Sequence, residues 1–193
     1  MSDYLPPIPA ASLPLSARSP GKCIIFGEHA VVHGAPELLF AIDLHTQVLV
    51  RGAARSSLNG DFEAAASHPY FRAALESPWA AGASVDVRAV SRIPRGAGLG
   101  SSAALSAGLV ATLSALAGGV DRPTLAQRSF DVERGAQGVG SPGDTSAAVA
   151  GGFLSINGTA SGPALWTVRD GPRSWEVRRV ADPGWVWVVA HSG

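Results

Sequence analysis

The sequence predicts an α+β fold in which a mixed or antiparallel sheet packs against helices. Segments with strand character come first, long Ala-rich helical segments follow, and strand segments return toward the end. This order favours α+β over the regular strand–helix alternation of a parallel sheet. At 193 residues, 46% hydrophobic and only 16% charged, the chain is long and apolar enough to bury a sizeable core.

Four segments with secondary-structure signals occupy the first half of the chain. Residues 22–27 (KCIIFG) form a short apolar run that ends at glycine, which predicts a buried strand. Residues 38–51 carry spaced β-branched side chains and predict one or two further strands. Residues 62–75 are Ala-rich and predict a helix that Pro69 breaks or starts. Residues 84–91 (SVDVRAVS) alternate apolar and polar side chains, as a half-buried strand does.

Two helices give the strongest signals in the second half. Residues 101–116 are rich in Ala, Leu and Ser without proline, which predicts an almost wholly buried helix. Asp121 is a suitable N-cap for a second helix that ends near Gly135, with Pro123 in its first turn. The remaining predicted elements are a loop at 139–145, a short helix at 145–150 and strands at 153–156, 164–168, 175–180 and 185–190.

Composition excludes several classes of protein. Fifteen basic and fifteen acidic residues leave no net charge, whereas a general nucleic-acid or acidic-membrane surface needs a basic excess. No apolar run approaches the roughly 20 residues that span a bilayer, and the proline-rich start lacks the basic end of a signal peptide. The single cysteine, Cys23, excludes an internal disulfide framework and a cysteine-based zinc site. We therefore expect a cytoplasmic protein, in which Lys22 is the only lysine.

A glycine-rich segment at residues 94–104 (PRGAGLGSSAA) is the strongest chemical feature. It follows a predicted strand and opens a predicted helix, whose unpaired N–H groups make an anion site suited to phosphate. Ser101 and Ser102 add hydroxyl groups, and one of them can ligate Mg²⁺ as a hard oxygen donor. The segment is neither a Walker A loop, since no lysine follows the last glycine, nor a Rossmann fingerprint, since no acidic residue ends a strand about 20 residues on.

A second polar cluster follows the first predicted strand. A Pro-Gly turn places Lys22 on this strand, which ends in Glu28 and His29, with His33 one turn on. Such a cluster is typical of a small-molecule site, although a lone histidine is more often a surface or hydrogen-bonded residue. The order of residues differs from the zinc motif HExxH, because Glu28 precedes the first histidine.

Two carboxylates, Glu133 and Asp144, form the third feature. Glu133 falls late on a predicted helix, and Asp144 follows a loop rich in Gly and Pro. Carboxylates that converge near a triphosphate can divide the work, one holding Mg²⁺ and the other accepting or orienting a hydroxyl proton. Taken singly, each is more often a surface or capping group, and Asp144 can cap the short helix after it.

Together the three segments resemble the GHMP kinase superfamily of galacto-, homoserine, mevalonate and phosphomevalonate kinases. Residues 94–104 are similar to its phosphate loop, P-x-x-x-G-L-G-S-S-A. Residues 19–34 (SPGKCIIFGEHAVVHG) are similar to the mevalonate kinase opening, A-P-G-K-x-x-x-x-G-E-H-A-V-V-x-G. The resemblance covers residues 15–193 and implies ATP-dependent phosphorylation of the primary hydroxyl of mevalonate to 5-phosphomevalonate, with Mg²⁺ as cofactor. Two alternatives are a kinase for another small hydroxy acid or sugar, and a catalytically incomplete nucleotide-binding fragment.

The resemblance also implies a role for each matching residue. Asp144 and Lys22 match catalytic residues, Ser102 and Glu133 match Mg²⁺ ligands, and Glu28 and His29 match residues that line the mevalonate pocket together with Asp144. The residues that match the ATP site are Lys22, Ser91, Gly96, Ala97, Gly98, Leu99, Gly100, Ser101 and Ser102.

The same resemblance predicts the domain organisation. Residues 1–14 are expected to be a flexible leader, residues 15–184 an N-terminal ATP-binding kinase domain, and residues 185–193 the first strand of a truncated C-terminal domain. The partners that it implies are ATP and mevalonate, with neither nucleic acid nor membrane, and some members of the family are homodimers.

Overall fold

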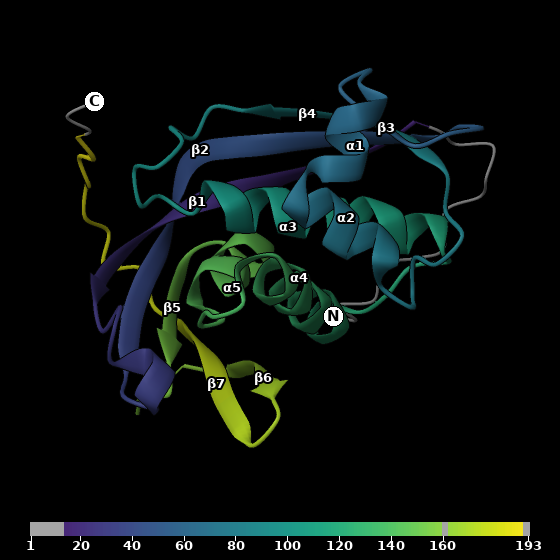
Figure 1. Ribbon diagram of the computed structural model, residues 1–193. Coiled ribbons are helices and arrows are strands. Elements are labelled where there is room, and N and C mark those ends of the chain that lie inside the picture. Colours follow the sequence, from purple (N-terminus) through teal and green to yellow (C-terminus); the bar gives the residue numbers. More distant parts are fainter. Residues whose placement is uncertain (1–13, 160–161, 191–193) are drawn as a thin grey trace.

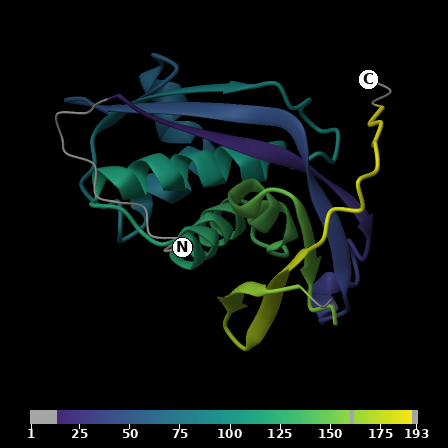
Figure 2. The same ribbon diagram turned by 180° about the vertical axis from the view of Figure 1, so that it is seen from behind.

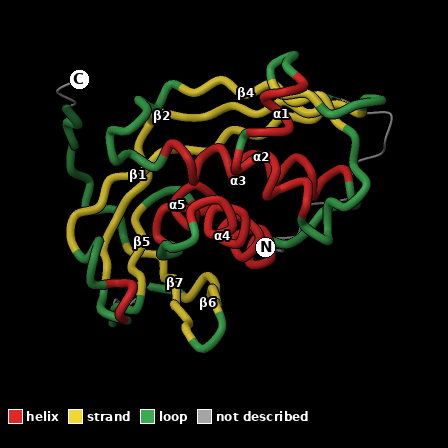
Figure 3. Tube along the Cα trace, in the orientation of Figure 1, coloured by secondary structure: helices red, strands yellow, loops and turns green. Residues whose placement is uncertain are grey.

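The computed structural model describes residues 14–159 and 162–190, which form one bent sheet around a group of helices (Figure 1). The bend lets the strands enclose the helices from two sides, as the colouring by secondary structure makes clear (Figure 3). The strands are β1 (Leu15–Phe26), β2 (Glu37–Gly52), β3 (Ser57–Leu58), β4 (Val85–Ser91), β5 (Phe153–Ile156), β6 (Ala164–Asp170) and β7 (Arg173–Val180). The helices are α1 (Phe62–Ser67), α2 (Pro69–Glu76), α3 (Ser101–Leu116), α4 (Arg122–Gln137) and α5 (Gly143–Ala150), with a 3₁₀ turn at Val31–His33.

The long strand β2 organises the sheet. Its first residues pair with β5 and its last residues with β4, while β1 runs antiparallel along its other edge. The strand order is β3-β4-β2-β5-β7-β6, and only the short β3–β4 pair is parallel. The register of β1 shifts between Pro20 and Lys22, so the ladder is interrupted immediately before the lysine. This is the mixed sheet that the sequence predicts.

Helix α3 is the centre of the fold and lies directly against β2. Gly108 permits this approach, because a Cβ atom there would lie 2.6 Å from Cγ2 of Val48. One hydrophobic cluster joins α2 and α3 to β2 and β4, and a second joins α4 and α5 to the strands β5–β7. In the second cluster the indole of Trp175 is buried and donates a 2.8 Å hydrogen bond to the carbonyl of Val31.

Most elements predicted from the sequence are confirmed. Helix α3 has the predicted bounds, the helix predicted at 62–75 divides at Pro69 into α1 and α2, and Asp121 caps α4 through a 2.8 Å hydrogen bond from the amide of Thr124. Residues 38–51 belong to one strand rather than two, and α5 begins at Gly143, slightly earlier than expected. No helix in the described part of the chain has the length and apolar character to cross a membrane.

The strand predicted at residues 185–190 is wrong. Residues 181–190 have no regular secondary structure and run along the outside of the sheet (Figure 2). Trp and Val favour a strand only where a neighbouring strand supplies hydrogen bonds, and no described strand pairs with this segment. The ring of Trp187 packs against that of Phe40, with the two ring centroids 4.7 Å apart. The predicted leader lies outside the described residues, apart from residue 14.

Candidate active site

A cavity of about 880 Å³ brings together segments that are distant in the sequence. The Gly-rich loop forms one wall, and Lys22, Glu28 and Asp144 reach the cavity from β1, the loop after β1 and α5. Most of the predicted ATP and substrate residues therefore line one cavity. These are Lys22, Glu28, Ser91, Gly96, Ala97, Gly98, Leu99, Gly100, Ser101, Ser102 and Asp144.

The Gly-rich loop ends at the N-terminus of α3 with its amide groups available to a ligand. Gly98 and Gly100 have φ angles of 71° and 72°, in the left-handed region that favours glycine. A Cβ atom at Gly100 would also lie 2.9 Å from Cγ of Lys22. Gly100 is the N-cap, and no side chain caps α3. The first amides of this long helix and its partial positive charge thus suit a phosphate group.

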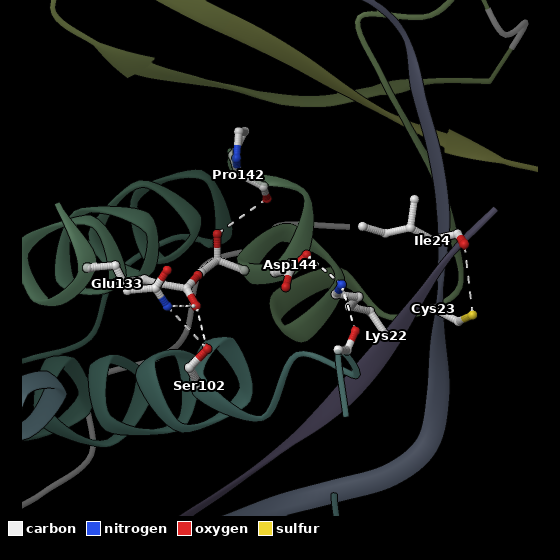
Figure 4. Close-up of polar contacts among 10 residues, drawn as sticks. Lys22, Cys23, Ile24, Ser102, Glu133, Pro142 and Asp144 are labelled. Atoms are coloured by element: carbon white, nitrogen blue, oxygen red, sulfur yellow. Dashed lines mark hydrogen bonds and ion pairs between the residues drawn. The ribbon is translucent and has the colours of Figure 1, made fainter. Parts of the chain in front are cut away.

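Lys22 joins the loop to the opposite wall. Where β1 leaves the regular ladder, the backbone amide of Lys22 donates a 3.0 Å hydrogen bond to the carbonyl of Leu99. Its Nζ donates a 2.9 Å bond to the carbonyl of Gly98 and lies 3.2 Å from Oδ1 of Asp144 (Figure 4). The residue is only 4% exposed. Its ammonium group is therefore held between the phosphate loop and the carboxylate.

Asp144 lies in the first turn of α5, and its side chain remains 29% exposed toward the cavity. Burial raises the pKa of its carboxyl group, whereas the charge and hydrogen bond of Lys22 lower it. The N-cap of α5 is Pro142, and no side chain makes a capping hydrogen bond there. The geometry thus favours a carboxylate directed at Lys22 over a helix cap.

Ser102 and Glu133 form a second polar pair, on α3 and α4. The hydroxyl of Ser102 donates a 2.8 Å hydrogen bond to Oε1 of Glu133 (Figure 4). Glu133 is 7% exposed, and burial is the main reason why its pKa is raised to about 7. The charge of Asp144 raises this pKa further, while the hydrogen bond from Ser102, the charge of Lys22 and the hydrogen bond from Gln137 lower it.

This pair suits a hard cation. A hydroxyl and a carboxylate are oxygen ligands, and Mg²⁺ in kinases takes one or two protein ligands and completes its shell with phosphate oxygens and water. A bound cation would also compensate the cost of ionising the buried Glu133. No group of three or more His, Cys, Asp or Glu side chains that could hold a metal ion occurs among the described residues, so phosphate oxygens and water would have to complete the ligand shell at Ser102 and Glu133.

Three predicted residues do not line the cavity, and one of them, Glu133, is joined to it only through its hydrogen bond with Ser102. His29 and His33 are exposed and do not line it, although their neighbour Glu28 does. Three further residues of the wall have no signal in the sequence. Thr46 of β2, which shares a 2.9 Å hydrogen bond with Ser91, lines the cavity, as do His68 and Tyr70. No local motif marks these residues, because tertiary packing brings them to the cavity, Thr46 from β2 and His68 and Tyr70 from the start of α2.

Glu37, a buried acid near Asp144, is a further residue that the sequence motifs do not include. One signal was available, because Glu37 is a charged residue that opens the otherwise apolar run ELLFAI.

Comparisons with known proteins agree with the fold and with the loop. Residues 63–152 match the family described as GHMP kinases N terminal domain. The chain is 39% identical over 131 residues to a mevalonate kinase of Archaeoglobus fulgidus, covering 63% of this chain and 45% of the relative. It is 34% identical over 152 residues to a mevalonate kinase of Methanothermobacter thermautotrophicus, covering 74% of this chain and 50% of the relative.

A solved mevalonate kinase structure is similar in fold, with a TM-score of 0.62 and 25% identity over 73% of this chain and 53% of that one. The present chain thus spans about half the length of the curated relatives it matches.

Proposed function

We propose that this chain, whose residues 63–152 match the N-terminal domain of GHMP kinases, takes part in the ATP-dependent phosphorylation of the primary hydroxyl of mevalonate to 5-phosphomevalonate. One observation carries the proposal. The Lys22 ammonium and the Asp144 carboxylate lie 3.2 Å apart, in the same cavity as the uncapped N-terminus of α3. An anion site, a cation and a proton acceptor at this spacing meet the needs of phosphoryl transfer, which depends mainly on positioning and charge stabilisation.

Each group has a task in this proposal. The loop of residues 96–102 and the first amides of α3 hold the phosphates of ATP. Lys22 stabilises negative charge on the transferring group and on the attacking oxygen. Asp144 accepts a hydrogen bond from the substrate hydroxyl, which it orients and whose proton it takes. Glu28 also lines the cavity and offers a further hydrogen-bond acceptor to the substrate.

Ser102 and Glu133 are the residues that would hold Mg²⁺. When bound by these two residues, the ion would supply positive charge next to the phosphate oxygens. In its absence the buried Glu133 favours its protonated form, because burial raises its pKa to about 7. Glu133 would therefore have to lose this proton to act as a ligand.

A coupled ADP-release assay across three acceptors tests the proposed substrate. We expect ADP release with mevalonate, and none with phosphomevalonate or galactose. Asp144→Asn should abolish most of the ADP release with mevalonate. The control is Asp43→Asn on β2, where the side chain is 98% exposed, and it should leave ADP release unchanged. Turnover with galactose or phosphomevalonate, but not with mevalonate, would favour a kinase for another acceptor.

A second candidate is a nucleotide-binding fragment without catalytic activity of its own. The observation in its favour is that the chain spans about half the length of its relatives. Calorimetric titration with Mg²⁺-ATP, combined with the ADP-release assay, separates the two candidates. Binding of ATP without ADP release on any acceptor would favour the fragment, and turnover by the 193-residue chain would exclude it. The homodimer, the cytoplasmic location and the domain limits at residues 15 and 184 remain predictions.

A further inference from the structure

Glu37 is a buried acidic residue that the proposed mechanism does not use. It is the first residue of β2, pairs with Ile156 of β5 and is only 1% exposed. Neither of its carboxyl oxygens has a hydrogen-bond partner among the described residues. Burying a polar group without a partner is costly, and burying a charge without a partner is more so. A side chain retained under these conditions calls for a physical explanation.

The position of Glu37 connects it to Asp144. Its carboxyl group packs against Gly143, where a Cβ atom would overlap Oε2 of Glu37. Gly143 is the first residue of α5 and immediately precedes Asp144. Glu37 does not line the cavity, so it does not reach a substrate there. It therefore acts on the site through the turn that carries Asp144.

The charges around Glu37 are unbalanced. Among the described residues, the charged groups that act on Glu37 are two acids, Asp144 of α5 and Glu28 after β1, and one cation, Lys22 of β1. Its β5 partner Ile156 is uncharged. Burial raises the pKa of Glu37 to about 7, with a contribution from Asp144; Lys22 opposes this rise, and Glu28 adds to it. A single ammonium group cannot neutralise three carboxylates. An ionised Glu37 would therefore be repelled by the carboxylate of Asp144.

We propose that Glu37 is a positioning residue that couples the Lys22–Asp144 ion pair to its own protonation. As an uncharged acid, Glu37 supports the turn at Gly143 and leaves Lys22 to pair with Asp144. When Glu37 releases its proton to solvent, the new carboxylate repels Asp144 and competes for Lys22. The ion pair then opens, and the site loses its alignment. The kinetic consequence rests on the proposed kinase function, whereas the structural consequence does not.

The first test measures the ion pair directly, without reference to activity. Carboxyl ¹³C NMR of Asp144 should show a titration step near pH 7 in the unaltered chain, caused by Glu37. Glu133 also has a pKa raised to about 7 and is coupled to Asp144, so the comparison is made in a Glu133→Gln background, which removes that second source of a step. Glu133→Gln alone should keep the step from Glu37, and adding Glu37→Gln, which keeps the shape but not the charge, should remove it. A step that persists in the double variant would overturn the proposal.

The kinetic arm uses the same variants in the ADP-release assay. The kcat of the unaltered chain should fall severalfold between pH 6 and pH 8, while its KM for ATP stays constant; Glu37→Gln should retain its pH 6 value at pH 8. A chain without kinase activity would overturn the proposed function and still leave the NMR result to decide the role of Glu37. An unchanged alkaline decline in an active Glu37→Gln would overturn the coupling.

A second pair of variants keeps the inference testable if Glu37→Gln does not fold. Gly143→Ala should lower the unfolding midpoint by several degrees and shift the Asp144 carboxyl signal, because the new methyl group displaces Glu37. Gly143 does not have a positive φ, so alanine itself fits the backbone there. In a Glu37→Ala background the same substitution should have little effect. Equal effects in both backgrounds would show that Glu37 does not bear on this turn.

Discussion

The Nζ atom of Lys22 lies 3.2 Å from Oδ1 of Asp144, and the same atom donates a hydrogen bond to the carbonyl of Gly98. Lys22 comes from the first strand, Asp144 from the last helix and Gly98 from the loop between β4 and α3. One ammonium group thus links the three parts of the candidate site. The four predictions that follow separate its role from those of its neighbours.

Lys22→Met should lower kcat far more than it weakens ATP binding. The loop amides and the N-terminus of α3 remain to hold phosphate, whereas the charge beside the transferring group is lost. Removal of one such electrostatic contact costs roughly 10²–10³-fold in rate. Steady-state kinetics and calorimetric ATP titration measure the two effects separately. Arg18→Met, on the same strand but outside the cavity, is the control. An unchanged kcat would exclude the proposed role of Lys22.

Asp144→Asn should reduce the rate by about 10²–10⁴-fold if the carboxylate acts as a general base. The amide keeps the size of the side chain but cannot take the hydroxyl proton. Single-turnover measurements at saturating ATP report the chemical step. A loss of under about threefold would indicate that Asp144 neither accepts nor orients the proton, since general base catalysis contributes far more than this.

Ser102→Ala should raise the Mg²⁺ concentration needed for half-maximal activity. The substitution removes one oxygen ligand and also the 2.8 Å hydrogen bond that Oε1 of Glu133 accepts. A Mg²⁺ titration at fixed ATP measures the shift. Ser67→Ala, at an exposed serine of α1, is the control for loss of a hydroxyl. An unaltered Mg²⁺ titration would contradict ligation by Ser102.

Glu133→Gln should make the chain more stable at neutral pH when Mg²⁺ is absent. The pKa of Glu133 is raised to about 7, above its ordinary value, so the folded state binds more protons than the unfolded state between these values. The free energy of unfolding consequently falls as the pH rises from about 4.5 to 7, by up to about 3 kcal/mol from this residue.

Denaturant unfolding at pH 5 and pH 8 checks this prediction. Glutamine still accepts the hydrogen bonds from Ser102 and Gln137 without a charge, so the variant should lose less stability over this range. Glu63→Gln, at an exposed residue of α1, controls for the loss of one acidic side chain. Parallel pH dependence in Glu133→Gln and the unaltered chain would show that Glu133 has no raised pKa.

Local sequence patterns were sufficient for most secondary-structure elements and for the phosphate loop. The spacing of glycines before an Ala-rich helix specifies an uncapped N-terminus, because that conformation depends on residues adjacent in the chain. Asp121 and Pro69 acted as helix signals for the same reason. The strand predicted at residues 185–190 failed because its side chains favour a strand only beside a partner strand, and the described part of the chain provides none.

The amino-acid sequence by itself determined which chemical groups are present and which local turns present them, namely the single lysine after Pro-Gly, the Gly-rich loop and the two carboxylates. The tertiary structure alone decided which of these groups meet. It placed Lys22 against Asp144, left His29 and His33 outside the cavity and buried Glu37 beneath the turn at Gly143. The physical reason is that backbone conformation depends on near neighbours, whereas contacts between charges depend on how the sheet bends around α3, α4 and α5.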